Sequence, residues 1–219
     1  MSVVRTSVRC MSSYSSDGRD AVIAAYDDLD AVFDRVLALS PDGLTCSEKL
    51  ALEDRMERNL RRAPAVEHRL LSSLCEVEPE VLGGTSLAEV LAARLRISKK
   101  DARGRIAQAQ LLGPGRALTG QELAPELPTV AQVQLQGLIG GEHVQVIERF
   151  FAQLPDAVDE ETREAAEGQL AELAVGFGPV ELRQAADRIA YLLNQDGSLS
   201  DAERARRRRV SVGKQVSMG

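Results

Sequence analysis

"SLAEVLAARLRISKKDARGRIAQAQLL", residues 86–112, decides the fold class, because it reads as two short amphipathic helices joined by a tight turn. Ser86 is followed three residues later by Glu89, and Ser98 is followed by Asp101. A hydroxyl residue three positions before an acid is the pattern that starts a helix. We therefore expect one helix from Ser86 to about Arg96 and a second from Ser98 to Leu112.

Small and apolar residues recur at helical spacing in both segments, as two helices that cross closely require. The residues predicted to hold the pair together are Leu91, Leu95 and the small Ala92 on the first helix, Ile97 in the turn, and Ala102, Ile106 and Ala109 on the second.

Helical periodicity extends over most of the remaining chain, and we find no strand-like alternation. Thr45 and Glu48 form a further capping pattern, and Pro64 predicts a kink or a break near residues 61–64 of the helix that follows. Residues 79–86 and 113–120 are predicted loops. The other predicted helices cover residues 19–39, 47–76, 128–136, 142–154, 157–175 and 179–194, and Ser200 with Glu203 begins a last one.

The sequence therefore predicts an all-α fold, a multi-helix bundle of about eight or nine helices with an embedded helix-turn-helix-like pair. Of the 219 residues, 44% are hydrophobic but only 3% are aromatic, so the core is expected to consist of aliphatic side chains and alanine. We expect a disordered tail over 1–18, one helical domain over 19–199 and a basic tail over 200–219. Translation could start at Met1 or at Met11.

The charges are segregated along the chain. The net charge is −6, yet residues 94–105 carry six basic residues and one acid, and residues 204–209 carry five arginines. Residues 156–172 carry seven acids and one arginine. An acidic chain is not a general polyanion binder, so any affinity for double-stranded DNA must come from a local patch.

Two basic segments are candidates for such a patch. On the second helix of the pair, Lys99, Lys100 and Arg103 share one face and are predicted to contact DNA, with Arg94 and Arg96 on phosphates. A nonspecific arm is predicted at Arg206, Arg207, Arg208 and Arg209. The alternatives are the solvated basic face of an ordinary helix pair and, for the arginine run, a frayed end or a contact with the acidic helix.

Three residues depart from the usual helix-turn-helix pattern. Arg96 stands where the turn usually has glycine, and Gly104 weakens the second helix by about 1 kcal/mol relative to alanine. Arg105 occupies a position that is usually aliphatic, so Ile106 is expected to take over its contact.

Catalytic patterns are absent from the sequence. His68 and His143 are isolated in helical stretches, where a packed or surface role is expected, and Cys10, Cys46 and Cys75 form no metal or disulfide pattern. Glu160, Glu161, Glu164 and Glu167 are expected to form a solvated helix face. We thus expect no enzyme, cofactor or metal site, and a cytoplasmic protein without a membrane segment.

The chain from residue 19 onward resembles the mycobacterial 13E12 repeat family, whose members carry domain of unknown function 222. The resemblance rests on "RAPAVEHRLLSSL", "GGTSLAEVLAARLRISKKDARGRIAQAQLLGPGRALTG", "LPTVAQVQLQGLIGGEHVQVI" and "LNQDGSLSDAERARRRRVSVGKQ". It implies that an HNH-endonuclease-like module often follows the helical part. No HNH histidine pair is present here, so the chain is expected to be truncated before that module.

These observations predict a non-catalytic helical domain that associates with DNA through its basic helix-turn-helix-like face. The alternatives are a protein-interaction or oligomerisation module, which pairs with another copy or with a separately encoded nuclease half, and a non-functional remnant of a split gene.

Overall fold

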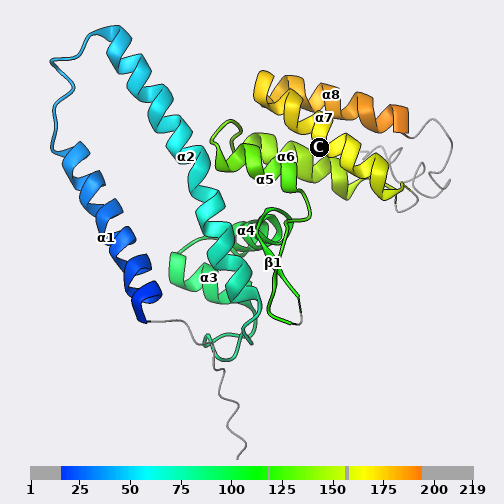
Figure 1. The fold of residues 1–219 in the computed structure, drawn as a ribbon, viewed down its shortest axis with the longest axis horizontal. Coiled ribbons are helices and arrows are strands. Elements are labelled where there is room, and N and C mark those ends of the chain that lie inside the picture. Colours follow the sequence, from blue (N-terminus) through cyan, green and yellow to red (C-terminus); the bar gives the residue numbers. More distant parts are fainter. Residues whose placement is uncertain (1–15, 118, 156–157, 194–219) are drawn as a thin grey trace, which may run out of the picture. The chain divides into compact units, whose positions relative to one another are not determined.

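The computed structural model describes residues 16–117, 119–155 and 158–193, and it confirms the all-α class (Figure 1). Eight helices lie in these ranges, which agrees with the predicted number, whereas the helix expected at Ser200 falls outside them. The helices are α1 (Ser16–Leu37), α2 (Cys46–Cys75), α3 (Leu87–Leu95), α4 (Lys99–Leu112), α5 (Pro128–Leu135), α6 (Gly141–Ala152), α7 (Glu160–Gly176) and α8 (Pro179–Leu193).

The chain divides into two units, residues 1–52 and 53–219, and each is described by itself. The first unit contains α1 and the beginning of α2, whose start Thr45 and Glu48 cap reciprocally: each backbone N–H donates to the side chain of the other residue. This confirms the predicted capping pattern, which satisfies backbone groups that a helix start leaves without partners.

The larger of two hydrophobic cores lies among α5, α6, α7 and α8 in the second unit. Helix α6 packs on α8, while α7 packs on both α5 and α8 (Figure 1). Val130, Ile139, Ile147, Leu170 and Leu182 are fully buried there. The core is largely aliphatic, as the low aromatic content predicts.

The prediction that Glu167 belongs to a solvated acidic face of α7 is wrong, because Glu167 is only 3% exposed. Helix α5 begins at Pro128, and the residue before it, Leu127, supplies no side-chain cap. Instead, the Val130 N–H donates to Glu167 Oε1 at 2.9 Å. Burial raises the pKa of Glu167, and the hydrogen bond opposes this shift by favouring the carboxylate. Glu167 is therefore a buried cap for a neighbouring helix.

Both histidines are buried, which confirms a packed role over a surface one. The Gly140 N–H donates to His143 Nδ1 at 3.4 Å, so Nε2 carries the proton and donates to the Phe177 carbonyl at 3.0 Å. His143 thereby joins the start of α6 to the end of α7. Burial also lowers the pKa of His68 on α2.

Helix α2 continues through Pro64, so of the predicted kink or break, the break is wrong. The surrounding residues are held by the corner between α5 and α6: Arg61 Nη1 donates to the Leu138 carbonyl at 3.3 Å, and Arg62 Nε donates to the Leu135 carbonyl at 3.1 Å. These tertiary bonds offset the backbone hydrogen bond that the proline removes.

A small antiparallel hairpin occupies part of the predicted loop at 113–120 and the residues that follow. Strand β1 (Gly115–Arg116) pairs with β2 (Glu122–Leu123). Two-residue strands are too short to show an alternating pattern, so periodicity could not reveal them. None of the described helices combines the length and the apolar character that crossing a membrane requires.

Candidate nucleic-acid interface on α3 and α4

A second, smaller core holds α3 and α4 against the end of α2. Its buried members are Leu71, Leu91, Ala102 and Ala109. Helix α4 packs closely on α3, and Ser72 Oγ on α2 donates to the Ala109 carbonyl at 3.2 Å. The predicted buried side of α4 is thus confirmed, and its opposite side is left to solvent.

The turn between α3 and α4 is short and capped on both sides. Ser86 Oγ accepts a hydrogen bond from the Glu89 N–H at the start of α3, and Ser98 Oγ accepts one from the Asp101 N–H at the start of α4. Arg96 ends α3 in the left-handed conformation, with φ 58° and ψ 39°. This is the position where the sequence lacks the expected glycine, so Arg96 carries backbone strain that glycine would not.

The residues predicted to lock the pair behave differently from one another. Ala92, Ile97 and Ile106 are half-buried against the small core, as predicted. Leu95 is 46% exposed, so its predicted contact between the helices is wrong. Helix α3 ends at Leu95, and the turn at Arg96 leads the chain away before this side chain can be covered.

Arg105 is held at the base of the pair. Its guanidinium donates to Glu67 on α2 at 2.9 Å and to Asp101 at 3.2 Å. The hydrogen bond to Glu67 and then that to Asp101 raise the pKa of Arg105. Arg105 therefore serves the packing of α4 on α2, while Ile106 supplies the apolar contact that was expected of it.

The exposed side of the pair carries the predicted basic residues. All five side chains predicted to contact DNA within the described part are exposed: Arg94, Arg96, Lys99, Lys100 and Arg103. Lys99 Nζ lies 2.6 Å from Glu89 Oε1, and this bond lowers the pKa of Glu89. Within the described ranges, no acid lies at ion-pair distance from the other four.

Helix geometry adds two residues that sequence reasoning missed. At 100° per residue, Ala107 and Gln110 continue the face of Lys99 and Arg103 along α4, and both are exposed. Ala107 lies four residues and Gln110 seven residues after Arg103, and this helical spacing could have revealed them. A small and a polar side chain here would let this face lie against a flat or grooved surface.

The first turn of α4 carries two lysines and one acid, Asp101. Lys99 and Lys100 occupy its first two positions, where the helix dipole is positive and favours acids. Backbone N–H groups at such an end attract phosphate, and the two lysines add positive charge beside them. The arrangement suits an external anion better than it suits the isolated helix.

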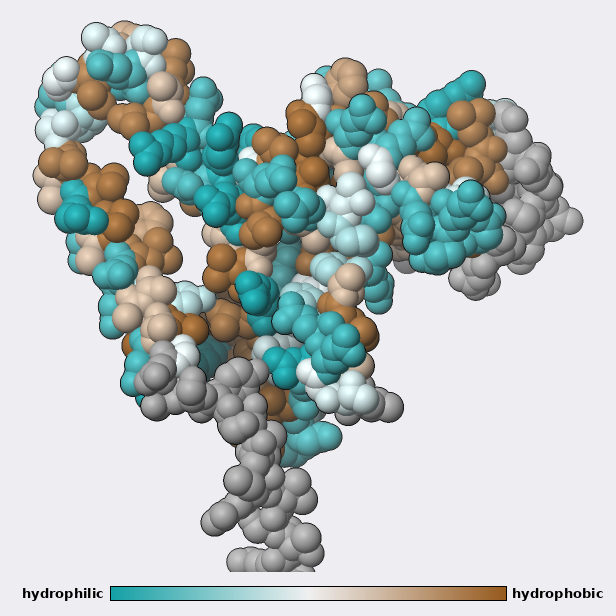
Figure 2. All heavy atoms as spheres, viewed as in Figure 1, coloured by the Kyte–Doolittle hydropathy of each residue, from teal (hydrophilic) through white to brown (hydrophobic). Residues whose placement is uncertain are grey.

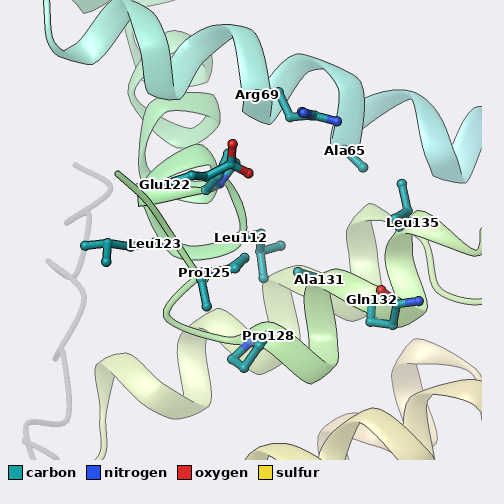
Figure 3. A pocket seen from close by; sticks show the side chains of 12 residues that line it. Ala65, Arg69, Leu112, Glu122, Leu123, Pro125, Pro128, Ala131, Gln132 and Leu135 are labelled. Atoms are coloured by element: carbon teal, nitrogen blue, oxygen red, sulfur yellow. The ribbon is translucent and has the colours of Figure 1, made fainter. Parts of the chain in front are cut away.

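A groove of about 530 Å³ lies elsewhere in the second unit, between α2, the hairpin and α5 (Figure 3). Its wall is mostly apolar, with Leu112, Pro125, Pro128 and Ala131 among its residues, and Arg69 and Glu122 are its charged ones. This lining holds no histidine, cysteine or serine. The described ranges also hold no group of acids, histidines and cysteines suited to a metal ion.

The predicted arm at Arg206–Arg209 lies outside the described residues.

These features define an all-α protein with an aliphatic helical core and a basic, doubly capped helix pair on its surface. The family described as "Domain of unknown function (DUF222)" matches residues 50–219. The chain belongs to this family, which agrees with the resemblance seen in the sequence.

The relatives are mycobacterial. The chain is 45% identical over 200 residues to the uncharacterized protein Rv1702cMb1728c and 43% identical over 197 residues to the uncharacterized protein Rv1128c, both of Mycobacterium tuberculosis strain H37Rv. It is 46% identical over 204 residues to the uncharacterized protein Mb1179c of Mycobacterium bovis. These alignments cover 90–91% of this chain and 44% of each relative, so the chain spans less than half their length. No solved structure matches the chain.

Proposed function

We propose that the chain binds double-stranded DNA through α3 and α4, acting as a helix-turn-helix-like pair whose second helix enters the major groove. The observation that carries the proposal is the exposed set of Arg94, Arg96, Lys100 and Arg103, which have no acidic partner among the described residues. Such cations gain little by facing water, whereas each one placed on a phosphate releases a bound counterion.

The position of Lys99 and Lys100 at the start of α4 supports the same proposal. In DNA-binding pairs of this kind, residues near the start of the second helix contact the bases. Arg94 and Arg96, at the end of α3, would then rest on phosphates beside the groove. The pairing of Lys99 with Glu89 would be exchanged for a phosphate contact on binding.

The test is fluorescence anisotropy of a labelled duplex titrated with the full chain over a salt series. The double variant Lys100→Glu/Arg103→Glu should weaken binding by at least about tenfold and reduce the salt slope by about two. Its matched control is Arg149→Glu/Arg183→Glu, which makes the same charge change at exposed residues of α6 and α8.

Equal affinity of wild type and Lys100→Glu/Arg103→Glu would refute the proposal for α3 and α4. If binding were instead lost on replacement of Arg206–Arg209 by glutamine, the arginine run alone would make the contact. Equal losses in the Lys100/Arg103 and Arg149/Arg183 variants would indicate nonspecific attraction and would also count against the proposal.

We assign no catalytic step to this chain. His143 is engaged by Gly140 and Phe177, His68 is buried on α2, and the groove beside the hairpin lacks a nucleophile. A DNA-anchoring role also suits the longer relatives, because a segment outside the shared region could act on the DNA that the helical part holds.

A further inference from the structure

Helix α1 carries an apolar face that covers about half of its circumference. All of its large apolar residues are exposed, among them Leu29 at 49% and Phe33 at 44%, and Figure 2 shows the hydrophobic surface that they form. The face consists of Val22, Ile23, Tyr26, Leu29, Val32, Phe33, Val36 and Leu37. Most helices in proteins are stabilised by tertiary packing of such an amphipathic face, so we expect α1 to have a partner along this face.

Helix α2 carries a matching stripe. Met56, Leu60, Val66 and Leu70 are exposed and continue the line of Leu52. Arg61, which bonds to Leu138, points to another side of the helix. The stripe lies opposite Arg61, whereas Arg62 beside it bonds to the Leu135 carbonyl, so the basic row borders the corner between α5 and α6. With the exposed Ala63 between Leu60 and Val66, its steps of three and four residues are those of a coiled-coil seam.

The charges beside the two stripes are complementary. Helix α1 contains six aspartates and two arginines, a net charge of −4, and Asp20, Asp27 and Asp34 recur at seven-residue intervals. On α2, Arg55 and Arg62 are followed at the same interval by Arg69. Seven-residue spacing keeps each row on one side of its seam, so an acidic row can run along a basic one.

The direction of this charge match requires two molecules. With Met56, Ala63 and Leu70 counted as a and with Leu52 and Val66 as d, the arginines take the g positions of α2 and Leu60 an e position. On α1, Asp30 at an e position and the aspartate row lie on the e side. The g side of one helix faces the e side of the next only when the helices run parallel. Residues 38–45 span at most about 32 Å, and the hydrogen bond from the Leu44 N–H to the Pro41 carbonyl shortens them. That reach is less than the length of α1, about 33 Å, so α1 cannot run parallel beside α2 of its own chain.

We propose that the protein is a homodimer in which α1 of each copy packs parallel along the Leu52–Leu70 stripe of α2 in the other copy. The two reciprocal contacts bury both apolar faces and place the aspartate row of α1 along Arg55, Arg62 and Arg69. This surface is separate from the basic face of α3 and α4, so the dimer does not depend on the proposed DNA binding.

Sedimentation equilibrium of the full chain over a concentration series tests the dimer. The wild type should be dimeric, and Leu29→Asp/Phe33→Asp should weaken association by at least about 100-fold, because two charges replace apolar side chains in each of two contacts. The matched control is Ala24→Asp/Ala31→Asp, on the opposite face of α1, which should stay dimeric. A monomeric wild type, or equal loss in both variants, would overturn the proposal.

A mixing experiment tests which helices meet. Leu60→Asp/Val66→Asp should be monomeric alone, as should Leu29→Asp/Phe33→Asp. Mixed together, they should form a heterodimer, because an intact α1 from one variant meets an intact α2 stripe from the other. Pairing of α1 with α1, or of α2 with α2, would give no such rescue. Failure of the mixture to associate, with both variants as helical as wild type by circular dichroism, would refute the proposed pairing.

Discussion

Arg96 is a residue whose backbone conformation lowers the stability of the protein. Arg96 ends α3 at φ 58°, a conformation that costs an ordinary residue about 1–2 kcal/mol. The structure offers it no ion pair among the described residues that would offset the strain. A residue that strains the backbone and faces water is a candidate for function, here the proposed phosphate contact.

Arg96→Gly should therefore stabilise the protein, by up to about 1 kcal/mol, and weaken DNA binding at the same time. Urea unfolding measures the first effect, and duplex anisotropy measures the second. Arg94→Gly is the matched control: it lies inside α3, where glycine should cost about 1 kcal/mol. Destabilisation by both glycines would contradict the strain at Arg96.

Glu167 predicts a dependence of stability on pH. Because burial raises its native pKa above the unfolded value, its contribution to stability is complete below about pH 4.3 and is lost as the pH rises through the native pKa. Glu167→Gln keeps an oxygen to accept from the Val130 N–H and removes the buried charge. The variant should melt above wild type at pH 8, and the gap should shrink toward pH 4.5.

Thermal unfolding of both proteins over this pH range checks the prediction. Glu172→Gln, at an exposed position of the same helix, should show no comparable trend. A gap that widened in acid would mean that the carboxylate stabilises the native fold.

At the scale of the elements, the corner between α5 and α6 depends on a glycine. Gly137 has φ 73°, and a Cβ there would lie 2.5 Å from the Arg58 carbonyl oxygen on α2. Gly137→Ala should therefore cost at least about 2 kcal/mol, from strain and from a backbone contact that cannot relax. Chemical denaturation monitored by circular dichroism gives the value.

Gly104→Ala provides the control for this substitution. It lies inside α4 with no atom within 4 Å of the added carbon, so alanine should stabilise the protein by about 0.5–1 kcal/mol. Opposite signs at the two glycines are expected, and a loss at Gly104 as large as that at Gly137 would contradict the account.

Helix starts were predictable because their signals are local. Thr45, Ser86 and Ser98 each make the capping hydrogen bond that the sequence indicates, and α4 ends at Leu112 as expected. The predictions that failed concern residues whose conformation or burial depends on contacts with residues distant in the sequence. Pro64 is tolerated because Arg61 and Arg62 bond to another helix corner, and Glu167 is buried because α5 lacks a cap of its own.

The sequence predicted which basic residues of the candidate site are exposed, but it did not predict the contacts that these residues make. The exposure of Lys100 and Arg103 follows from helical period alone. The bond between Lys99 and Glu89 does not, because it joins two helices across a turn whose geometry is set by Arg96. The predicted contact of Leu95 was wrong for the same reason, because helical periodicity does not show at which residue α3 ends.

At the scale of the whole molecule, the two proposals together predict an effect of DNA length. A dimer presents two copies of the α3–α4 pair, so a duplex long enough for both should bind more tightly than a short one. Wild type should prefer a 40-base-pair duplex to a 12-base-pair one by more than about tenfold beyond the statistical gain.

Leu29→Asp/Phe33→Asp should lose this preference and keep its affinity for the short duplex. Ala24→Asp/Ala31→Asp should retain both. Loss of affinity for the short duplex would show that the α1 substitutions disturb the basic pair itself.

Because α2 is continuous, labels on its two natural cysteines can report distances along the helix. Cys46 and Cys75 are exposed free thiols at its two ends, about 44 Å apart along a continuous helix. With Cys10 replaced by serine, spin labels on these thiols would give one intramolecular distance that any bend at Pro64 must shorten. A second set of distances, present only at high protein concentration, would come from the other copy and could triangulate its position.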